Sequence, residues 1–115
     1  MQKYIKVTGL TNTVQVVNCN NILGIVRPNT TSASFGITTA DTETKIVYID
    51  ANSATSEVTT FDHAAAGSGT NRVAQANFIK DLIVQAWEQP YTEPFVTVDG
   101  TDFPLTVTLV NPAGS

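Results

Sequence analysis

The stretch FDHAAAGSGTN, residues 61–71, contains the only histidine of the chain, preceded by an aspartate. His63 could act as a general base if a carboxylate oriented its ring. Asp62 is the nearest candidate, but adjacent residues of a strand point to opposite faces, which places it poorly for that role. No serine lies in a nucleophile-elbow sequence, and Cys19 could serve His63 only if the fold brought the two together. We therefore expect a structural His63, and a small enzyme using His63 is the disfavoured alternative.

The same stretch has glycines at 67 and 69 just before a predicted helix, where a helix N-terminus could bind phosphate. A dinucleotide site needs a third glycine within a βαβ unit, and a P-loop needs Gly-Lys-Ser/Thr. The chain has neither sequence. We interpret these residues as a flexible connection that ends in a helix cap, and we expect no cofactor.

Acidic residues gather in three predicted loops, at 41–43, 50–52 and 99–102. Calcium needs several converging oxygens, and the sequence DANSATSE departs from the EF-hand pattern after its second ligand position. Transition metals prefer histidine and cysteine ligands, of which the chain has one each. Solvated turns are the favoured interpretation, and we expect no metal site.

Three aromatic residues lie in the last turn of the predicted helix and just after it: Trp87, Tyr91 and Phe95. Aromatic side chains often anchor protein interfaces, so this group could form a contact patch. Packing beneath the connection to the last strands is an equal alternative. Both interpretations are kept at this point.

The composition excludes several classes of function. The chain has 115 residues, of which 14% are charged and 18 are threonine, with a net charge of −4. Its six Lys and Arg residues form no cluster, so we expect binding neither to nucleic acid nor to an anionic membrane. No apolar run approaches the ~18 residues of a spanning helix, the first residues do not read as a signal peptide, and one cysteine cannot form an intramolecular disulfide.

Hydrophobic periodicity predicts one domain, residues 1–115, of the α+β class. A helix is expected over about 72–88, capped by Thr70 or Asn71, because apolar residues there recur every three or four positions. A closing hairpin is expected at the Asp99–Gly100 turn, with Pro104 in its second, edge strand. The predicted strands are 3–7, 13–17, 22–26, 32–38 with a bulge at Gly36, the hairpin pair 45–49 and 57–61, 95–98 and 101–110. They should form a mostly antiparallel sheet of about six to eight short strands, or a partly closed barrel, with the helix packed on it.

The order of these elements resembles that of small accessory proteins encoded near the structural genes of tailed bacteriophages, notably those infecting marine bacteria. The segments that carry the resemblance are KYIKV, NNILGIV, TKIVYID, EVTTFDHA, the helix NRVAQANFIKDLIVQAW and a closing pair of strands. The resemblance implies a non-enzymatic virion component, such as a capsid decoration protein, that is made in the host cytoplasm and contacts other virion proteins. A small ligand- or glycan-binding module is the alternative.

Self-association is also expected. The predicted helix has an apolar stripe too wide for one contact, and strand edges with few lysines tend to pair or to be covered. A homo-oligomer would bury such a patch on every copy. A trimer is suggested only by analogy with capsid accessories.

Overall fold

The computed structural model describes residues 2–11, 13–49 and 55–111. It confirms the α+β class: mostly antiparallel sheets with one α-helix packed on them, and no closed barrel in the part described. Nine strands occur there rather than six to eight, because two strands of two residues each replace the single strand predicted over 32–38. The elements are β1 (Tyr4–Leu10), β2 (Thr13–Asn18), β3 (Ile22–Val26), β4 (Thr31–Ser32), β5 (Ile37–Thr38), β6 (Glu43–Ile49), β7 (Ser56–His63), α1 (Gly69–Glu88), β8 (Phe95–Asp99), the 3-10 helix η1 (Gly100–Asp102) and β9 (Val107–Asn111).

The first sheet, called sheet A, has the order β2-β1-β8. β1 and β2 form an antiparallel pair, whereas β8 lies parallel to β1. The predicted closing hairpin is therefore wrong. Asp99 caps η1 instead of opening a two-residue turn, because its Oδ1 accepts from the Thr101 backbone N at 2.9 Å and its own N donates to Asp102 Oδ2 at 3.1 Å. The chain then leaves sheet A for a different sheet.

The second sheet, sheet B, is antiparallel with the order β3-β6-β7-β9. The predicted hairpin of β6 and β7 is confirmed, with Val47 opposite Val58, and β6 is an interior strand as expected. β9 is an edge strand, but it begins at Val107. Pro104 therefore lies before the strand and not within it, which corrects the predicted position.

A small hairpin of β4 and β5 replaces the single strand predicted over 32–38. The chain turns between the two strands, and Gly36 has a φ of +66°, which suits glycine. Phe35 from this turn lies against the bare backbone of Gly24 in β3, since a Cβ built on Gly24 would be 3.0 Å from the Phe35 ring. The hairpin thus covers part of the outer face of sheet B.

Helix α1 begins at Gly69, earlier than predicted, because Ser68 is its N-cap. The Ser68 Oγ accepts a hydrogen bond from the Asn71 backbone N at 3.2 Å, so the expected caps Thr70 and Asn71 both lie inside the helix. Serine is among the strongest N-cap residues. The prediction that the connection before the helix, which includes Gly67 and Gly69, ends in a helix cap is confirmed.

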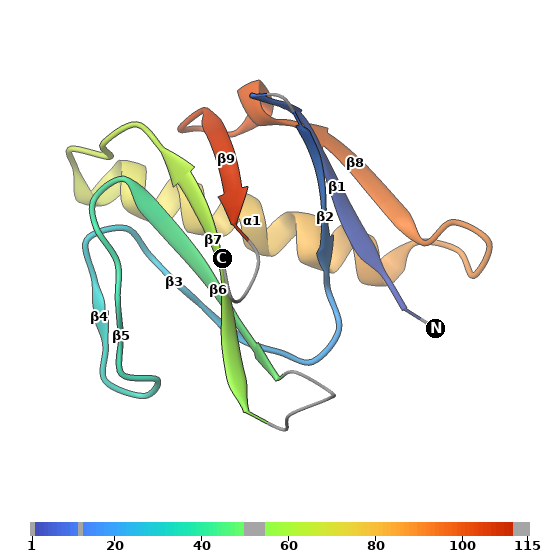
Figure 1. Ribbon diagram of the computed structural model, residues 1–115, viewed down its shortest axis with the longest axis horizontal. Helices are drawn as coiled ribbons and strands as arrows, with labels where there is room; N and C mark the ends of the chain where they lie inside the picture. Colours follow the sequence, from blue (N-terminus) through green and yellow to red (C-terminus); the bar gives the residue numbers. More distant parts are fainter. Residues whose placement is uncertain (1, 12, 50–54, 112–115) are drawn as a thin grey trace.

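The helix crosses behind both sheets, and it contacts β1 and β8 of sheet A and β3 of sheet B (Figure 1). One core therefore lies between two sheets and one helix, which explains the wide apolar stripe. Val73 and Trp87, near the two ends of the helix, also fit the apolar spacing, but they are 39% and 52% exposed and lie outside the core. The buried helix residues are Gln75, Ala76, Ile79, Leu82, Ile83 and Ala86. No helix in the described part is long and apolar enough to cross a bilayer.

Candidate functional site

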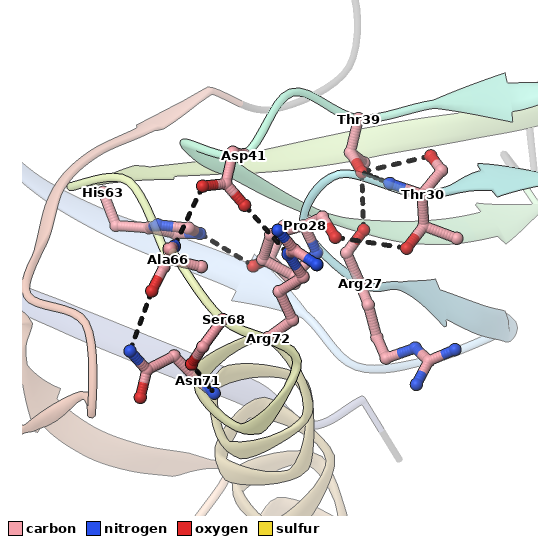
Figure 2. Close-up of polar contacts among 12 residues, drawn as sticks. Arg27, Pro28, Thr30, Thr39, Asp41, His63, Ala66, Ser68, Asn71 and Arg72 are labelled. Atoms are coloured by element: carbon pink, nitrogen blue, oxygen red, sulfur yellow. Dashed lines mark hydrogen bonds and ion pairs between the residues drawn. The ribbon is translucent and has the colours of Figure 1, made fainter.

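His63 is the last residue of β7, and its ring is packed inside the protein with 5% exposure (Figure 2). Its Nδ1 lies 2.8 Å from the Ala64 carbonyl oxygen, which can only accept, so Nδ1 carries the proton. Nε2 then accepts from the Thr44 hydroxyl at 2.9 Å. Thr44 is itself fully buried. Both ring nitrogens are thus used by the fold.

The two groups considered as helpers of His63 lie elsewhere. Asp62 points to the opposite face of β7, as expected, and its Oδ2 accepts from the Asn111 side chain at 3.2 Å. Cys19 follows β2 in sheet A and is completely buried. Burial raises the pKa of the Cys19 thiol to about 12, which keeps it protonated at neutral pH. Among the described contacts, the hydroxyl that is hydrogen-bonded to His63 Nε2 belongs to Thr44, which is fully buried.

Replacing His63 with alanine should lower the free energy of unfolding by about 2 kcal/mol, because the buried Thr44 hydroxyl loses its partner. Adding Thr44→Val to that variant should recover part of the loss, since it removes the orphaned hydroxyl. The oligomeric state should be unchanged in both. Urea unfolding and sedimentation equilibrium measure these effects. A His63→Ala protein that is as stable as the parent would contradict the structural role.

The loop before β6 holds the start of the helix through Asp41 (Figure 2). One carboxylate oxygen accepts from the Gly67 backbone N at 2.9 Å, and the other accepts from Arg72 Nε at 3.0 Å. The Asp41 carbonyl accepts from the backbone N of Ala66 at 3.1 Å. Asn71 closes the network, because its side-chain amide donates to the Ala66 carbonyl at 2.8 Å. Residues 61–71 therefore lead into a helix whose first turn is held in place by these hydrogen bonds.

The three acidic loops have different outcomes. Asp41 binds its own chain, so the expectation of a solvated turn is wrong there. Asp99 and Asp102 cap η1, which also differs from a simple solvated turn. Residues 50–52 lie outside the described residues. Among the described residues, no group of three or more His, Cys, Asp and Glu is placed to hold a metal ion.

The Asp41 contacts predict an acid-dependent loss of stability. Hydrogen bonds from the Gly67 amide, and then from Arg72, lower the pKa of Asp41 below its ordinary 3.8. A carboxyl whose pKa is lowered by folding stabilises the folded state above the ordinary pKa, and this contribution is lost as the pH falls through the lowered value. Asp41→Asn should therefore be less stable than the parent at pH 7, and the difference should shrink below pH 3.8. Urea unfolding across this range, with exposed Asp81→Asn as control, tests it; an unchanged difference would count against the network.

A recess of about 310 Å³ lies beside this network and is lined by both arginines of the chain. Asp41 neutralises Arg72 at 3.0 Å, so the positive charge of the recess rests on Arg27. The backbone of Arg27 is fixed, because its carbonyl accepts from the Thr39 hydroxyl. The six lining residues are Arg27, Asn29, Thr30, Gly69, Arg72 and Val73, and they include no carboxylate, imidazole or thiol. This lining offers no acid–base pair for catalysis.

The three predicted interface residues lie at the surface. Trp87, Tyr91 and Phe95 are 52%, 78% and 45% exposed. Trp87 still has a fixed orientation, because its Nε1 donates to the Cys19 carbonyl at 2.8 Å. Phe95 stacks on Tyr4 with ring centroids 5.5 Å apart. Exposure of all three favours the contact-patch interpretation, which stays a prediction.

Lys3 organises this end of the molecule, and sequence reasoning missed it. It is only 8% exposed, and its Nζ donates to the carbonyls of Gln89 and Pro90 at 2.7 and 3.0 Å. Helix α1 has no basic residue in its last turn, so Lys3 supplies the positive charge that favours a helix C-terminus. Lys3 lies in the segment 3–7 that the sequence predicts as a strand, and nothing in that segment indicates this role.

The outer face of sheet A includes Phe95, one of these three aromatic residues. The residues of each strand that alternate with the core positions point outward there. The register places Asn18, Tyr4 and Phe95 in one row, and Val16, Lys6 and Thr97 in the next. We call the following set the sheet-A face: Tyr4, Lys6, Thr8, Val14, Val16, Asn18, Phe95, Thr97 and Asp99.

Comparison of the chain with models of protein families, with curated proteins and with solved structures finds no match.

Proposed function

We propose that the protein is a non-enzymatic structural component of a tailed-phage particle, a capsid decoration protein or similar accessory, that binds other virion proteins and further copies of itself. The exposed apolar surface of sheet A carries this proposal. Nine large hydrophobic side chains are exposed in the described part of the chain, and five of them belong to sheet A or to the end of the helix and the segment that lead into β8. These five are Val14, Val16, Trp87, Tyr91 and Phe95.

The character of this surface supports protein contacts. Lys6 and Asp99 are the two charged residues of the sheet-A face, and threonine and asparagine supply the other polar groups. Interface cores are depleted of charge and enriched in aromatic residues. Trp87 and Phe95 are held by their contacts with Cys19 and Tyr4, so binding would immobilise few free rotamers.

The packing of His63 supports a non-enzymatic role. Its two ring nitrogens are bonded to Thr44 and Ala64, and the ring is buried. A general base must reach the proton that it removes. Using His63 in this way would require the end of β7 to open.

Localisation on particles tests the proposal directly. Purified phage particles from a host culture that carries the gene should contain the protein in a fixed ratio to the major capsid or tail protein. Gold-labelled antibody should mark one position on the particle in negative stain. Absence from washed particles would overturn the proposal.

A surface variant tests the route of attachment. Tyr91→Ser should reduce incorporation about tenfold, because Tyr91 is 78% exposed and its loss should leave the fold intact. Val84→Ser, at an exposed valine on α1, is the matched control and should incorporate normally. Binding of the free protein to a glycan array, lost in Tyr91→Ser, would instead support the ligand-binding module.

A further inference from the structure

Among the described residues, strand β2 has one edge that pairs with no other strand. The Cys19 backbone N donates to the Lys3 carbonyl at 2.9 Å, which makes Lys3 and Cys19 a hydrogen-bonded pair. Such pairs alternate along an antiparallel ladder, so the backbone groups of Val17 and Gln15 also face β1. The N–H and C=O groups of Val14 and Val16 consequently point away from β1. Within the described sheets, β1 is the sole neighbour of β2.

The residues of β2 itself carry none of the side chains that usually protect an edge strand. Natural edge strands carry lysine, proline or a covering segment. The sequence of β2 is TVQVVN, which contains no charge and no proline. Val14 and Val16 are 51% and 47% exposed. The strand therefore offers outward backbone groups and apolar side chains to another strand, although the Val14 carbonyl also accepts from the Thr13 hydroxyl at 3.4 Å.

Space that could take side chains of a further strand lies beside the edge. A groove of about 210 Å³ runs between β2 and the inner face of sheet B. Gln15, Val16, Val17 and Asn18 form its β2 side, and Tyr48, Thr59 and Val110 form its other side. A strand laid along β2 would direct alternate side chains into this groove.

We propose that this strand is β2 of a second copy, paired antiparallel about a two-fold axis with Gln15 opposite Gln15. Val14 of each copy then faces Val16 of the other, and each of these two pairs exchanges its outward backbone hydrogen bonds. This pairing gives a partner to Val14 and Val16, which belong to the exposed surface that carries the proposed function. In this respect it rests on the proposed function.

The sequence of β2 suits its own copy. In this register the two valine pairs form one apolar cluster on the sheet-A face, and β-branched pairs stabilise such contacts. The two Gln15 amides meet on the groove side, where they can bond each other. Thr13 of one copy lies opposite Val17 of the other, and its small side chain faces the groove. No like charges meet, because β2 has none.

Substitutions at Val16 test the interface by sedimentation equilibrium at micromolar concentration. The parent should be a dimer of the 12.3 kDa chain. Val16→Pro removes the outward N–H without touching the β1 ladder, and Val16→Lys adds a charge to the edge. Both should weaken association at least tenfold. Leu109→Lys, at an exposed residue of the sheet-B edge strand, is the matched control and should leave it unchanged.

A crosslink tests the register. Gln15 opposite Gln15 is a non-hydrogen-bonded pair with Cα atoms ~4.5 Å apart, within the range of a disulfide. Gln15→Cys should give a disulfide-linked dimer on mild oxidation, and Thr97→Cys on β8 should not. Cys19 gives no background, because it is buried.

A monomeric parent, a trimer, or a dimer that survives Val16→Pro without the crosslink would overturn this inference. Incorporation into particles by such a protein would leave the proposed function standing, so the two can fail separately.

Discussion

Replacing Gly100 with alanine should lower the free energy of unfolding by about 3 kcal/mol, because the added methyl group has no room. Gly100 is buried at the start of η1, and a Cβ there would collide with the backbone carbonyl oxygen of Val107. A backbone oxygen cannot swing aside like a side chain. The start of β9 would have to move, which disturbs its pairing with His63.

Thermal unfolding of Gly100→Ala measures this effect, and the midpoint should fall by roughly 10 °C for a domain of this size. Gly69→Ala is the matched control. Gly69 is the first residue of α1, and nothing lies within 4 Å of a Cβ built there. The control should be neutral or slightly stabilising. Equal losses in the two variants would show that Gly100 is not a tight contact.

Replacing Gln75 with leucine should cost about 3 kcal/mol. Gln75 is completely buried on α1, and its amide makes a reciprocal pair with the backbone of Leu105. Its Nε2 donates to the Leu105 carbonyl at 3.0 Å, and its Oε1 accepts from the Leu105 N at 2.8 Å. Leucine has a similar size, but it leaves a backbone donor and acceptor without partners, at about 1–3 kcal/mol for each group.

Urea unfolding of Gln75→Leu should show this loss, and Gln85→Leu on the exposed side of the same helix should change stability by less than about 0.5 kcal/mol. Amide exchange should also quicken at Leu105 in the first variant alone. A stable Gln75→Leu protein with unchanged exchange would mean that the segment before β9 is held by other contacts.

The elements that the sequence predicted well are those specified by neighbours along the chain. The spacing of Ala76, Ile79 and Ile83 predicts helix α1, and two apolar runs joined by a polar loop predict the β6–β7 hairpin. The opposite directions of Asp62 and His63 follow from strand geometry alone.

The errors came from contacts between distant residues. Asp99–Gly100 is typical of a hairpin turn, but the long-range pairing of β8 with β1 takes precedence, and Asp99 caps η1 instead. Asp41 binds Gly67 and Arg72, which are 26 and 31 residues away. Nothing in the local sequence distinguishes such an aspartate from a solvated one.

The sequence indicates the candidate interface residues by their aromatic type, but it does not indicate their position on the folded surface. Trp87, Tyr91 and Phe95 are candidates by their aromatic type near the end of the helix, and their exposure of 52%, 78% and 45% is a property of the folded chain. Gln75 and Lys3 were missed because polar side chains are normally expected at the surface. Their partners are backbone groups of segments that only the folded chain brings near.

The central position of β1 also sets the order of events during synthesis. β1 lies between β2, which follows it directly, and β8, whose Val98 is 90 residues from its hydrogen-bond partner Thr8. A growing chain on the ribosome can form the β1–β2 hairpin early, but the other side of β1 stays unpaired until almost the whole polypeptide has been made. Contacts this distant in sequence slow folding, and unpaired strand edges promote aggregation in the meantime. Sheet A is therefore completed only when translation is nearly over. Premature termination before Phe95 leaves a fragment in which β1 and β2 each have an edge that can pair with other chains.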